Sequence, residues 1–199
     1  MGRIVITTNM SLDGVVEDPD GGEGFERGGW FATSGGDDLA AWAELETAEA
    51  LGASAMLLGR ASDAWFAARW TTRPGAWADR LNALPKYVVS STLDAPAWTN
   101  ATVLRGDLVD EVRGVKAAHD GEILVYASYQ LVRALLEHGL ADELRLVVFP
   151  VVLGGGARLF GDTVDPKRLR LLDARPLGSD LAFLSYAVGT SAEAPGGNG

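Results

Sequence analysis

Short apolar runs alternate along the chain with longer stretches in which apolar residues recur every three to four positions. The short runs are rich in β-branched residues, which is typical of buried strands. We expect strands at 4–6, 55–58, 86–89, 102–104, 122–126 and 144–152. Two further runs, 168–174 and 181–188, lie close together around Gly178 and predict an antiparallel pair.

The longer stretches predict helices over 37–51, 62–69, 76–84, 108–118 and 128–138. Asp37 and Asp38 stand at the start of the first helix, where acidic side chains complement the helix dipole. Before this helix, segment 9–36 is rich in glycine and acidic residues and predicts a long irregular loop. A loop of this length inside a compact domain is usually functional or disordered.

The order of these elements predicts the fold class. Strands alternate with helices through the first two-thirds of the chain, and two consecutive strands follow. This order favours an α/β fold with a mixed sheet, mostly parallel with an antiparallel edge, and helices on both faces. Neither an interdomain linker nor an internal repeat interrupts it. We therefore expect a single domain over 1–189 and a flexible C-terminal tail, 190–199, of mostly small residues.

Composition narrows the function classes. The chain has no cysteine and only two histidines, which argues against a disulfide scaffold and a thiolate or His-rich metal site. The net charge of −10 disfavours nucleic acid as a partner, although a local cationic pocket for one small phosphate stays open. No segment has the pattern of a signal peptide or a membrane span, so we expect a cytoplasmic protein without membrane contact.

The turns after the strands are the expected place for chemistry, because ligands of open α/β sheets bind beyond the carboxyl ends of the strands. Gly59, Arg60 and Ser62 at a helix start combine free N–H groups, a cation and a hydroxyl, as a phosphate seat requires. The turn 90–92 offers three hydroxyls for a second phosphate or a ribose. The alternative is that such hydroxyls are ordinary helix caps and the glycines ordinary turns. That alternative is the better one for a single turn, whereas several turns at one edge favour a site.

Several well-known catalytic motifs are missing. No G-x-G-x-x-G follows a strand, and the chain has neither a phosphate-binding P-loop nor a G-x-S-x-G nucleophile elbow. His138 is expected to close a helix, and His119 to lie in an exposed turn. The remaining candidates for general acid–base chemistry are carboxylates and phenols, namely Asp13, Asp37, Asp38, Tyr126 and Tyr129.

Aromatic residues surround the long loop and the Gly59 turn. Trp30, Trp42, Trp65 and Trp70 could wall a planar ring, with Trp30 and Trp42 the candidates for substrate binding. Core packing is an equally good interpretation for Trp42 and Trp65.

Several motifs occur in the order found in the dihydrofolate reductase-like proteins related to the C-terminal reductase domain of the riboflavin biosynthesis deaminase/reductase. They lie at 3–17, with Ser11-Leu12-Asp13-Gly14 at its centre, at Leu57-Leu58-Gly59-Arg60, at 86–92, at 139–144 and at 149–160. The last, Phe-Pro-Val-Val-Leu-Gly-Gly-Gly-Ala-Arg-Leu-Phe, is the most specific. The matches cover nearly the whole chain, which resembles that family.

The resemblance implies a three-layer α/β sandwich around a mixed, roughly eight-stranded sheet and NADPH-dependent reduction of a small heterocyclic or ribosyl substrate. It places the cofactor on Gly59, Arg60, Ala61, Ser62, Ser90, Ser91, Thr92, Tyr126, Ala127, Ser128, Tyr129, Gln130 and Leu131. It brings Ser11 and Asp13 to the nicotinamide and substrate, and it favours a homodimer. Asp38 locally resembles the acid that protonates the pteridine in dihydrofolate reductases, although an ordinary acid at a helix start is the better interpretation.

This chain departs from the family pattern at two positions. Ala127 stands where a glycine is usual, and its methyl group would crowd a pyrophosphate. Asp63 would repel a phosphate unless it turned away. The absence of cysteine excludes the zinc-dependent deaminase half. The leading hypothesis is an NADPH-dependent reductase in which Asp13, Asp38 or water supplies the proton; the alternative is a non-catalytic nucleotide- or ligand-binding module.

Overall fold

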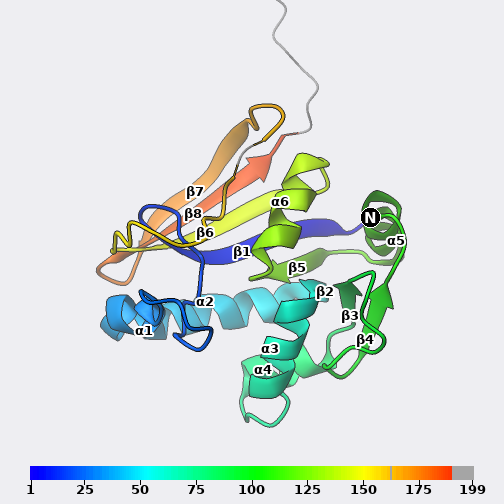
Figure 1. Cartoon of the computed structure of the whole chain (residues 1–199), viewed down its shortest axis with the longest axis horizontal. Helices are drawn as coiled ribbons and strands as arrows, with labels where there is room; N and C mark the ends of the chain where they lie inside the picture. Colours follow the sequence, from blue (N-terminus) through cyan, green and yellow to red (C-terminus); the bar gives the residue numbers. More distant parts are fainter. Residues whose placement is uncertain (162, 190–199) are drawn as a thin grey trace, which may run out of the picture.

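One mixed sheet of eight strands forms the centre of the molecule, in the order β4-β3-β2-β5-β1-β6-β8-β7 (Figure 1). The computed structural model describes residues 1–161 and 163–189, so the predicted tail at 190–199 lies outside the described residues. The strands are β1 (Arg3–Ser11), β2 (Ala53–Gly59), β3 (Lys86–Val89), β4 (Ala101–Leu104), β5 (Glu122–Tyr126), β6 (Glu143–Phe149), β7 (Leu169–Leu177) and β8 (Leu181–Val188). β1 to β6 run parallel, and β8 is antiparallel to both β6 and β7.

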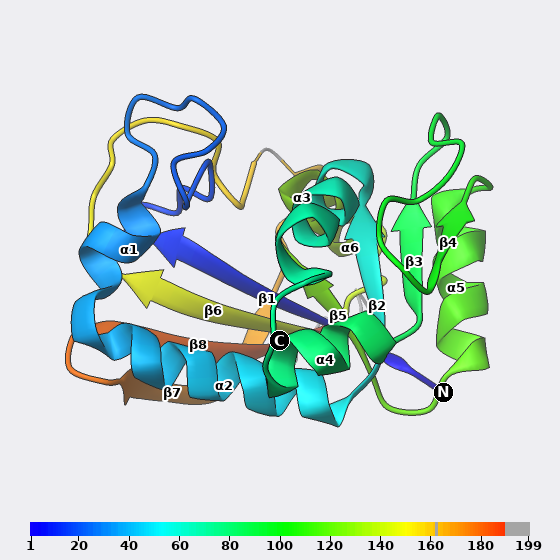
Figure 2. The same ribbon diagram turned by 90° about the horizontal axis from the view of Figure 1, so that it is seen from below.

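Helices cover both faces of this sheet and make the three layers that the resemblance implies. α5 (Leu108–Ala118) and α6 (Tyr129–Glu137) pack on one face. The other face carries α1 (Trp30–Gly35), the 3-10 turn η1 (Gly36–Asp38), α2 (Leu39–Gly52), α3 (Arg60–Trp70) and α4 (Ala76–Ala83). Figure 1 shows α5 and α6 on one side of the strands and α1 to α4 on the other, and in Figure 2, which is seen from below, α2 and α4 lie in front of the strands. The α/β prediction is therefore confirmed.

The buried apolar residues alternate between the two faces of the central strands. Ile4 and Ile6 of β1 pack toward α5 and α6, whereas Val5 between them packs toward α2, α3 and α4. This alternation follows from the period of two in a strand. Because both faces are covered, the central parallel strands read as continuous apolar runs in the sequence.

The predicted strands and helices are largely confirmed, but β1 and β7 extend further than predicted and α1 was not predicted. The predicted loop 9–36 is shorter than expected, because β1 continues to Ser11 and α1 begins at Trp30. β6 ends at Phe149 rather than at residue 152, because the N–H of Val151 bonds back to the Phe149 carbonyl and turns the chain. Among the described residues, no helix is long and apolar enough to span a membrane.

Candidate functional site

The turn between β2 and α3 presents a bare helix start. Gly59 ends β2 and is the N-cap residue of α3, and no side chain caps this helix. The first N–H groups of a helix have no partner within it, so they are free to bind an anion. The side chain of Arg60 is exposed and that of Ser62 is buried. The structure thus places the predicted cation, hydroxyl and N–H groups in one turn.

The turn between β5 and α6 is strained. Ala127 and Ser128 have φ angles of 49° and 54°, in the left-handed region that glycine adopts without difficulty. An L-residue in this region costs about 1 kcal/mol. No side chain caps α6 either, although its N-cap residue is a serine. Of the first three helical residues, Tyr129 is half-buried and Gln130 exposed, whereas Leu131 lies in the core and can offer a ligand only its backbone.

A pair of serines joins these two turns. The Gly59 N–H donates to Ser128 Oγ over 3.0 Å, and the Ser128 hydroxyl donates to Ser62 Oγ over 2.7 Å. The two turns come together because β2 and β5 are paired neighbours in the sheet. The starts of α3 and α6, 66 residues apart in sequence at this serine pair, are therefore neighbours.

The turn after β3 lies at the same edge, because β3 pairs with β2 in parallel. Ser90 Oγ accepts the N–H groups of Thr92 and Leu93 over 3.3 and 3.1 Å, which folds the turn back on itself. Ser91 and Thr92 are exposed. The hydroxyls that remain available to a ligand are thus those of Ser91 and Thr92.

The loop after β1 is clamped to the glycine-rich segment that follows β6. Asp13 Oδ1 accepts the N–H of Leu153 over 3.0 Å and Oδ2 that of Gly154 over 2.9 Å. The Ser11 hydroxyl donates to Asp13 Oδ1 over 2.7 Å. These hydrogen bonds, that from Ser11 foremost, lower the pKa of the Asp13 carboxyl to about 2. Asp13 is therefore an ionised anchor of two loops.

The sequence model of the RibD C-terminal domain matches residues 3–183, which is nearly the whole chain. The chain belongs to the RibD C-terminal domain family. The chain is also similar in sequence to the uncharacterized protein YyaP of Bacillus subtilis (strain 168), with 31% identity over 101 residues. That match covers 51% of this chain and 53% of YyaP, so it spans about half the length of each protein.

Solved structures show the same fold at low sequence identity. A protein from Shewanella sp. PV-4 named for riboflavin biosynthesis superposes with a TM-score of 0.74 at 19% identity, covering 94% of this chain and 99% of its own. The deaminase/5-amino-6-(5-phosphoribosylamino)uracil reductase of Thermotoga maritima gives 0.63 at 13% identity, covering 94% and 57%. Dihydrofolate reductase from Enterococcus faecalis, complexed with NADP(H), gives 0.56 at 14% identity, covering 94% and 97%. The RibD C-terminal domain described here has the dihydrofolate reductase-like fold.

Asp63, one of the two positions that depart from the family pattern, directs its side chain toward the segment before β4. Asp63 is buried, and its carboxylate accepts the N–H groups of Ala97 and Trp98 over 2.6 and 3.2 Å. It thereby fastens the segment before β4 to α3. In this RibD C-terminal domain, the Asp63 carboxylate is hydrogen-bonded to those two N–H groups. The repulsion of a phosphate that was expected from Asp63 is therefore reduced.

Asp38 lies at the far end of the sheet from the serine pair. Its carboxylate accepts the N–H groups of Ser179 and Asp180 over 2.8 and 2.7 Å, in the hairpin between β7 and β8. These bonds lower the pKa of Asp38 below its usual range. The geometry therefore speaks against Asp13 and Asp38 as proton donors at neutral pH, because hydrogen bonds from the Ser11 hydroxyl and backbone N–H groups to Asp13, and from backbone N–H groups to Asp38, favour the ionised carboxylates.

The two candidate tryptophans differ in what they leave exposed. Trp30 is 2% exposed, packs edge-on against Phe149 and donates its indole N–H to the Glu17 carbonyl. This burial speaks against a role for Trp30 as the wall of a ligand pocket. Trp42 is half-buried and donates its indole N–H to Asn9 Oδ1 over 2.9 Å, near the carboxyl end of β1. Trp42 retains an accessible surface beside the site.

The long loop after β1 reaches across to α3. Asp20 Oδ2 accepts hydrogen bonds from Arg69 Nη2 over 2.8 Å and from the indole N–H of Trp65 over 3.2 Å. The Arg69 guanidinium also lies over the Trp65 ring, 4.2 Å from its centroid. The loop is thus tied to the second half of α3. Trp65 serves this contact, an arrangement that its sequence position did not reveal.

Two buried glutamates on α2 form a polar cluster that the sequence interpretation missed. Glu46 and Glu49 face the sheet at Thr7, which pairs with Tyr126 on β5 and with Arg145 on β6. Burial, and then the charge of Glu49, raise the pKa of Glu46 well above its usual range. Burial raises the pKa of Glu49 to about 6 despite the opposing charge of Arg145. Helical spacing from Trp42 already put Glu46 and Glu49 on one side of the helix and was the available signal.

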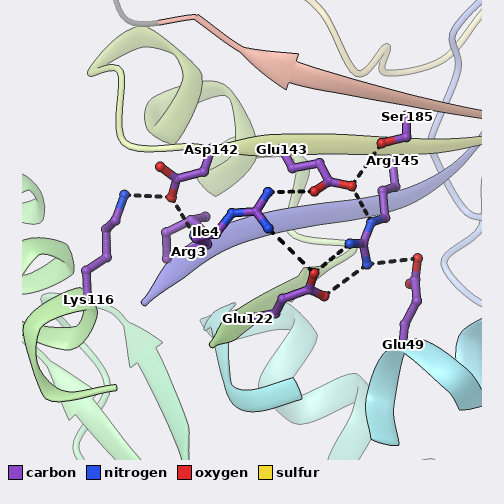
Figure 3. Close-up of polar contacts among 9 residues, drawn as sticks. All are labelled: Arg3, Ile4, Glu49, Lys116, Glu122, Asp142, Glu143, Arg145 and Ser185. Carbon is purple, nitrogen blue, oxygen red and sulfur yellow. Dashed lines mark hydrogen bonds and ion pairs between the residues drawn. The ribbon is translucent and has the colours of Figure 1, made fainter. Parts of the chain in front are cut away.

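Figure 3 shows an ion-pair network at the opposite edge of the sheet, where β1, β5 and β6 begin. Arg145 contacts Glu122 and Glu143 over 2.7 Å each and Glu49 over 3.4 Å. Arg3 adds a second contact to Glu143 over 2.8 Å. Because Arg145 and Glu49 are largely buried, removal of the Arg145 side chain would leave the Glu49 carboxyl group without its cationic partner. This network holds the strands together at the edge away from the turns.

The two histidines lie away from the serine-lined turns. His119 shares a 2.8 Å hydrogen bond between Nε2 and the Tyr87 hydroxyl, and it is half-buried rather than in the exposed turn that was expected. His138 is the C-cap residue of α6 as predicted. Within residues 1–161 and 163–189, no group of three or more His, Cys, Asp or Glu residues is arranged to hold a metal ion.

Proposed function

We propose that this RibD C-terminal domain is an NADPH-dependent reductase that transfers hydride to a small heterocyclic or ribosyl substrate. The observation that carries the proposal is the pair of helix starts at one sheet edge. α3 and α6 both begin without a capping side chain, and Ser62 and Ser128 join their first turns. Two sets of free N–H groups side by side suit a diphosphate better than a single phosphate. The coarser reductase-like assignment rests on the family.

The donors at this edge fit the phosphate groups of NADPH. The β5–α6 turn would hold the pyrophosphate, whose charge the N-terminus of α6 favours. The exposed Arg60 guanidinium would pair with the 2′-phosphate, since arginine binds phosphate through two parallel hydrogen bonds. Ser91 and Thr92 would add hydroxyl donors from the neighbouring turn. Because the chain has a net charge of −10, the Arg60 guanidinium would supply a local attraction for phosphate that the protein as a whole does not offer.

The chain's own part in the reaction is to position the reactants. NADPH, when bound, supplies the hydride. The clamp between Asp13 and the 153–154 segment would fix the loop beside the substrate, and the contact of Asp20 with Arg69 ties the long loop to the last turn of α3. Since Asp13 and Asp38 are held ionised, the proton that accompanies the hydride comes from water.

A second candidate function is a non-catalytic binding module on the same fold. The observation that favours it is the left-handed Ala127–Ser128 turn, where side chains narrow the approach to the backbone. Such a module would bind a nucleotide at the same edge and would not oxidise NADPH in the presence of any acceptor.

Titration with NADPH and NADH, followed by fluorescence and calorimetry, tests the proposal. We expect binding of NADPH that is tighter than that of NADH. Absence of binding of either dinucleotide at millimolar concentration would contradict the reductase and favour a module for another ligand. Oxidation of bound NADPH with dihydrofolate or with 5-amino-6-(5-phosphoribosylamino)uracil then separates the reductase from the module.

We also propose that the protein is a homodimer. β7 is an edge strand of the sheet and exposes Leu169, Leu171 and Leu172 by 37%, 52% and 44%. An exposed apolar edge strand favours pairing with another chain. Light scattering checks this state; a monomer mass that persists across concentrations from micromolar to millimolar would contradict it.

A further inference from the structure

Ser128 occupies the N-cap position of α6 but does not cap that helix. A serine at this position ordinarily accepts an N–H of the first turn. Here the side chain points to the neighbouring turn instead, where it accepts the N–H of Gly59 and donates to Ser62 Oγ. The first-turn N–H groups of α6 are left without a side-chain acceptor as a result.

The backbone of Ser128 shows that this arrangement has a cost. Its φ of 54° lies in the left-handed region, where glycine would fit without strain. A serine is therefore explained by its hydroxyl and not by its backbone preference. Since Ser62 is buried, removal of the Ser128 hydroxyl would also leave the Ser62 side chain without this partner.

We propose that Ser128 is a positioning residue that sets the distance between the starts of α3 and α6, and through it the affinity for a ligand that spans both turns. The inference rests on the proposed function and extends it, because it names the residue that makes two separate anion seats into one dinucleotide site. A ligand that occupies the α3 turn alone does not depend on this distance.

Two neighbouring glycine substitutions separate the effect of losing the Ser128 hydroxyl from the effect of relieving backbone strain. Ser128→Gly and Ala127→Gly each relieve one left-handed L-residue, and only Ser128→Gly removes a hydroxyl. Ser54→Ala is a control at the other end of β2, where it deletes a hydroxyl that donates to the Glu122 carbonyl. All variants are titrated with NADPH and with adenosine 2′-monophosphate, a fragment that keeps the 2′-phosphate and lacks both phosphates of the pyrophosphate, and their thermal unfolding is recorded.

For Ser128→Gly we expect about tenfold weaker binding of NADPH, equivalent to one lost hydrogen bond, and little change for the fragment. The melting temperature should change little, since the relief of strain opposes the lost contacts. Ser54→Ala should keep the NADPH affinity of the unchanged chain. Ala127→Gly should improve it, because the substitution removes the methyl group that crowds the pyrophosphate and relieves a left-handed L-residue.

Three outcomes would overturn the inference in distinguishable ways. Equal NADPH affinity in Ser128→Gly and the unchanged chain would show that the hydroxyl sets no distance. A parallel loss for NADPH and the fragment, with a lower melting temperature, would show a structural tether only. If the unchanged chain binds no NADPH, the proposed function fails and this inference fails with it.

Discussion

The carboxylate of Asp13 lies 2.9 Å from the backbone nitrogen of Gly154, although 141 residues separate the two in sequence. The neighbouring N–H of Leu153 bonds to the other carboxylate oxygen. This pair of bonds fixes the loop after β1 against the segment after β6, and it defines what Asp13 does in the fold.

We predict that Asp13→Asn lowers the free energy of unfolding by about 1–2 kcal/mol at pH 7, because charged acceptors form the stronger hydrogen bonds. The pKa of Asp13 is lowered to about 2, so its contribution is complete above the unfolded value near 3.8 and is lost as the pH falls toward 2. Urea unfolding between pH 2 and 7 measures both effects. Asp94→Asn, at an exposed position, is the control and should change neither. An unchanged stability of Asp13→Asn at pH 7 would refute the anchoring role.

Asp38→Ala should loosen the hairpin between β7 and β8 while NADPH binding is retained. The carboxylate accepts the N–H groups of Ser179 and Asp180, and their loss exposes both amides to solvent. Hydrogen exchange of these two amides should accelerate, with exchange in β5 as the internal reference. Loss of NADPH affinity without faster exchange would instead give Asp38 a role at the ligand.

Glu46→Gln should remove a pH dependence of stability. Because the pKa of Glu46 is raised in the fold, the folded state holds a proton that the unfolded state releases above about pH 4.5. Stability should therefore fall as the pH rises from that value through the raised folded pKa. In Glu46→Gln this part of the fall should disappear, whereas Glu44→Gln, on an exposed position of the same helix, should keep it. Denaturant titrations from pH 4 to 9 provide the measurement.

Arg60→Gln should weaken NADPH binding about tenfold to a hundredfold and change NADH binding little. The reason is the loss of a charge-assisted contact to the 2′-phosphate, which NADH lacks. Calorimetric titration with both dinucleotides gives the ratio, with Arg113→Gln on α5 as the control for net charge. A similar loss of affinity for both dinucleotides would show that Arg60 does not bind the 2′-phosphate.

The strands and most helices could be predicted because their signals are local. β3, β5, β8 and α5 have the predicted bounds, since apolar runs and helical spacing lie within each segment. α1 escaped prediction because six residues carry little periodic signal and its place depends on the contact of Trp30 with Phe149. The turns at Gly59 and Ser128 were predicted as site elements, but the hydrogen bond that joins them was not.

The side chains with long-range partners could not be assigned from sequence. Glu49 looks like any helix glutamate, and its cationic partner Arg145 is 96 residues away. Asp38 stands at a helix start, where an acid needs no further explanation, yet its acceptor role belongs to a hairpin 141 residues later. Only the folded arrangement shows which acid is free to act and which is already engaged.

The ion pairs of Figure 3 lie at one edge of the sheet, and the serine-linked turns lie at the other. Rigidity and recognition are therefore encoded by different residues. A library that varies residues 60–61, 91–92 and 129–130 would leave the serine pair, Arg145 and the carboxylate partners of Arg145 intact. Such a library should retain folded members at high frequency, so new ligand preferences could be selected in this scaffold without prior stabilisation.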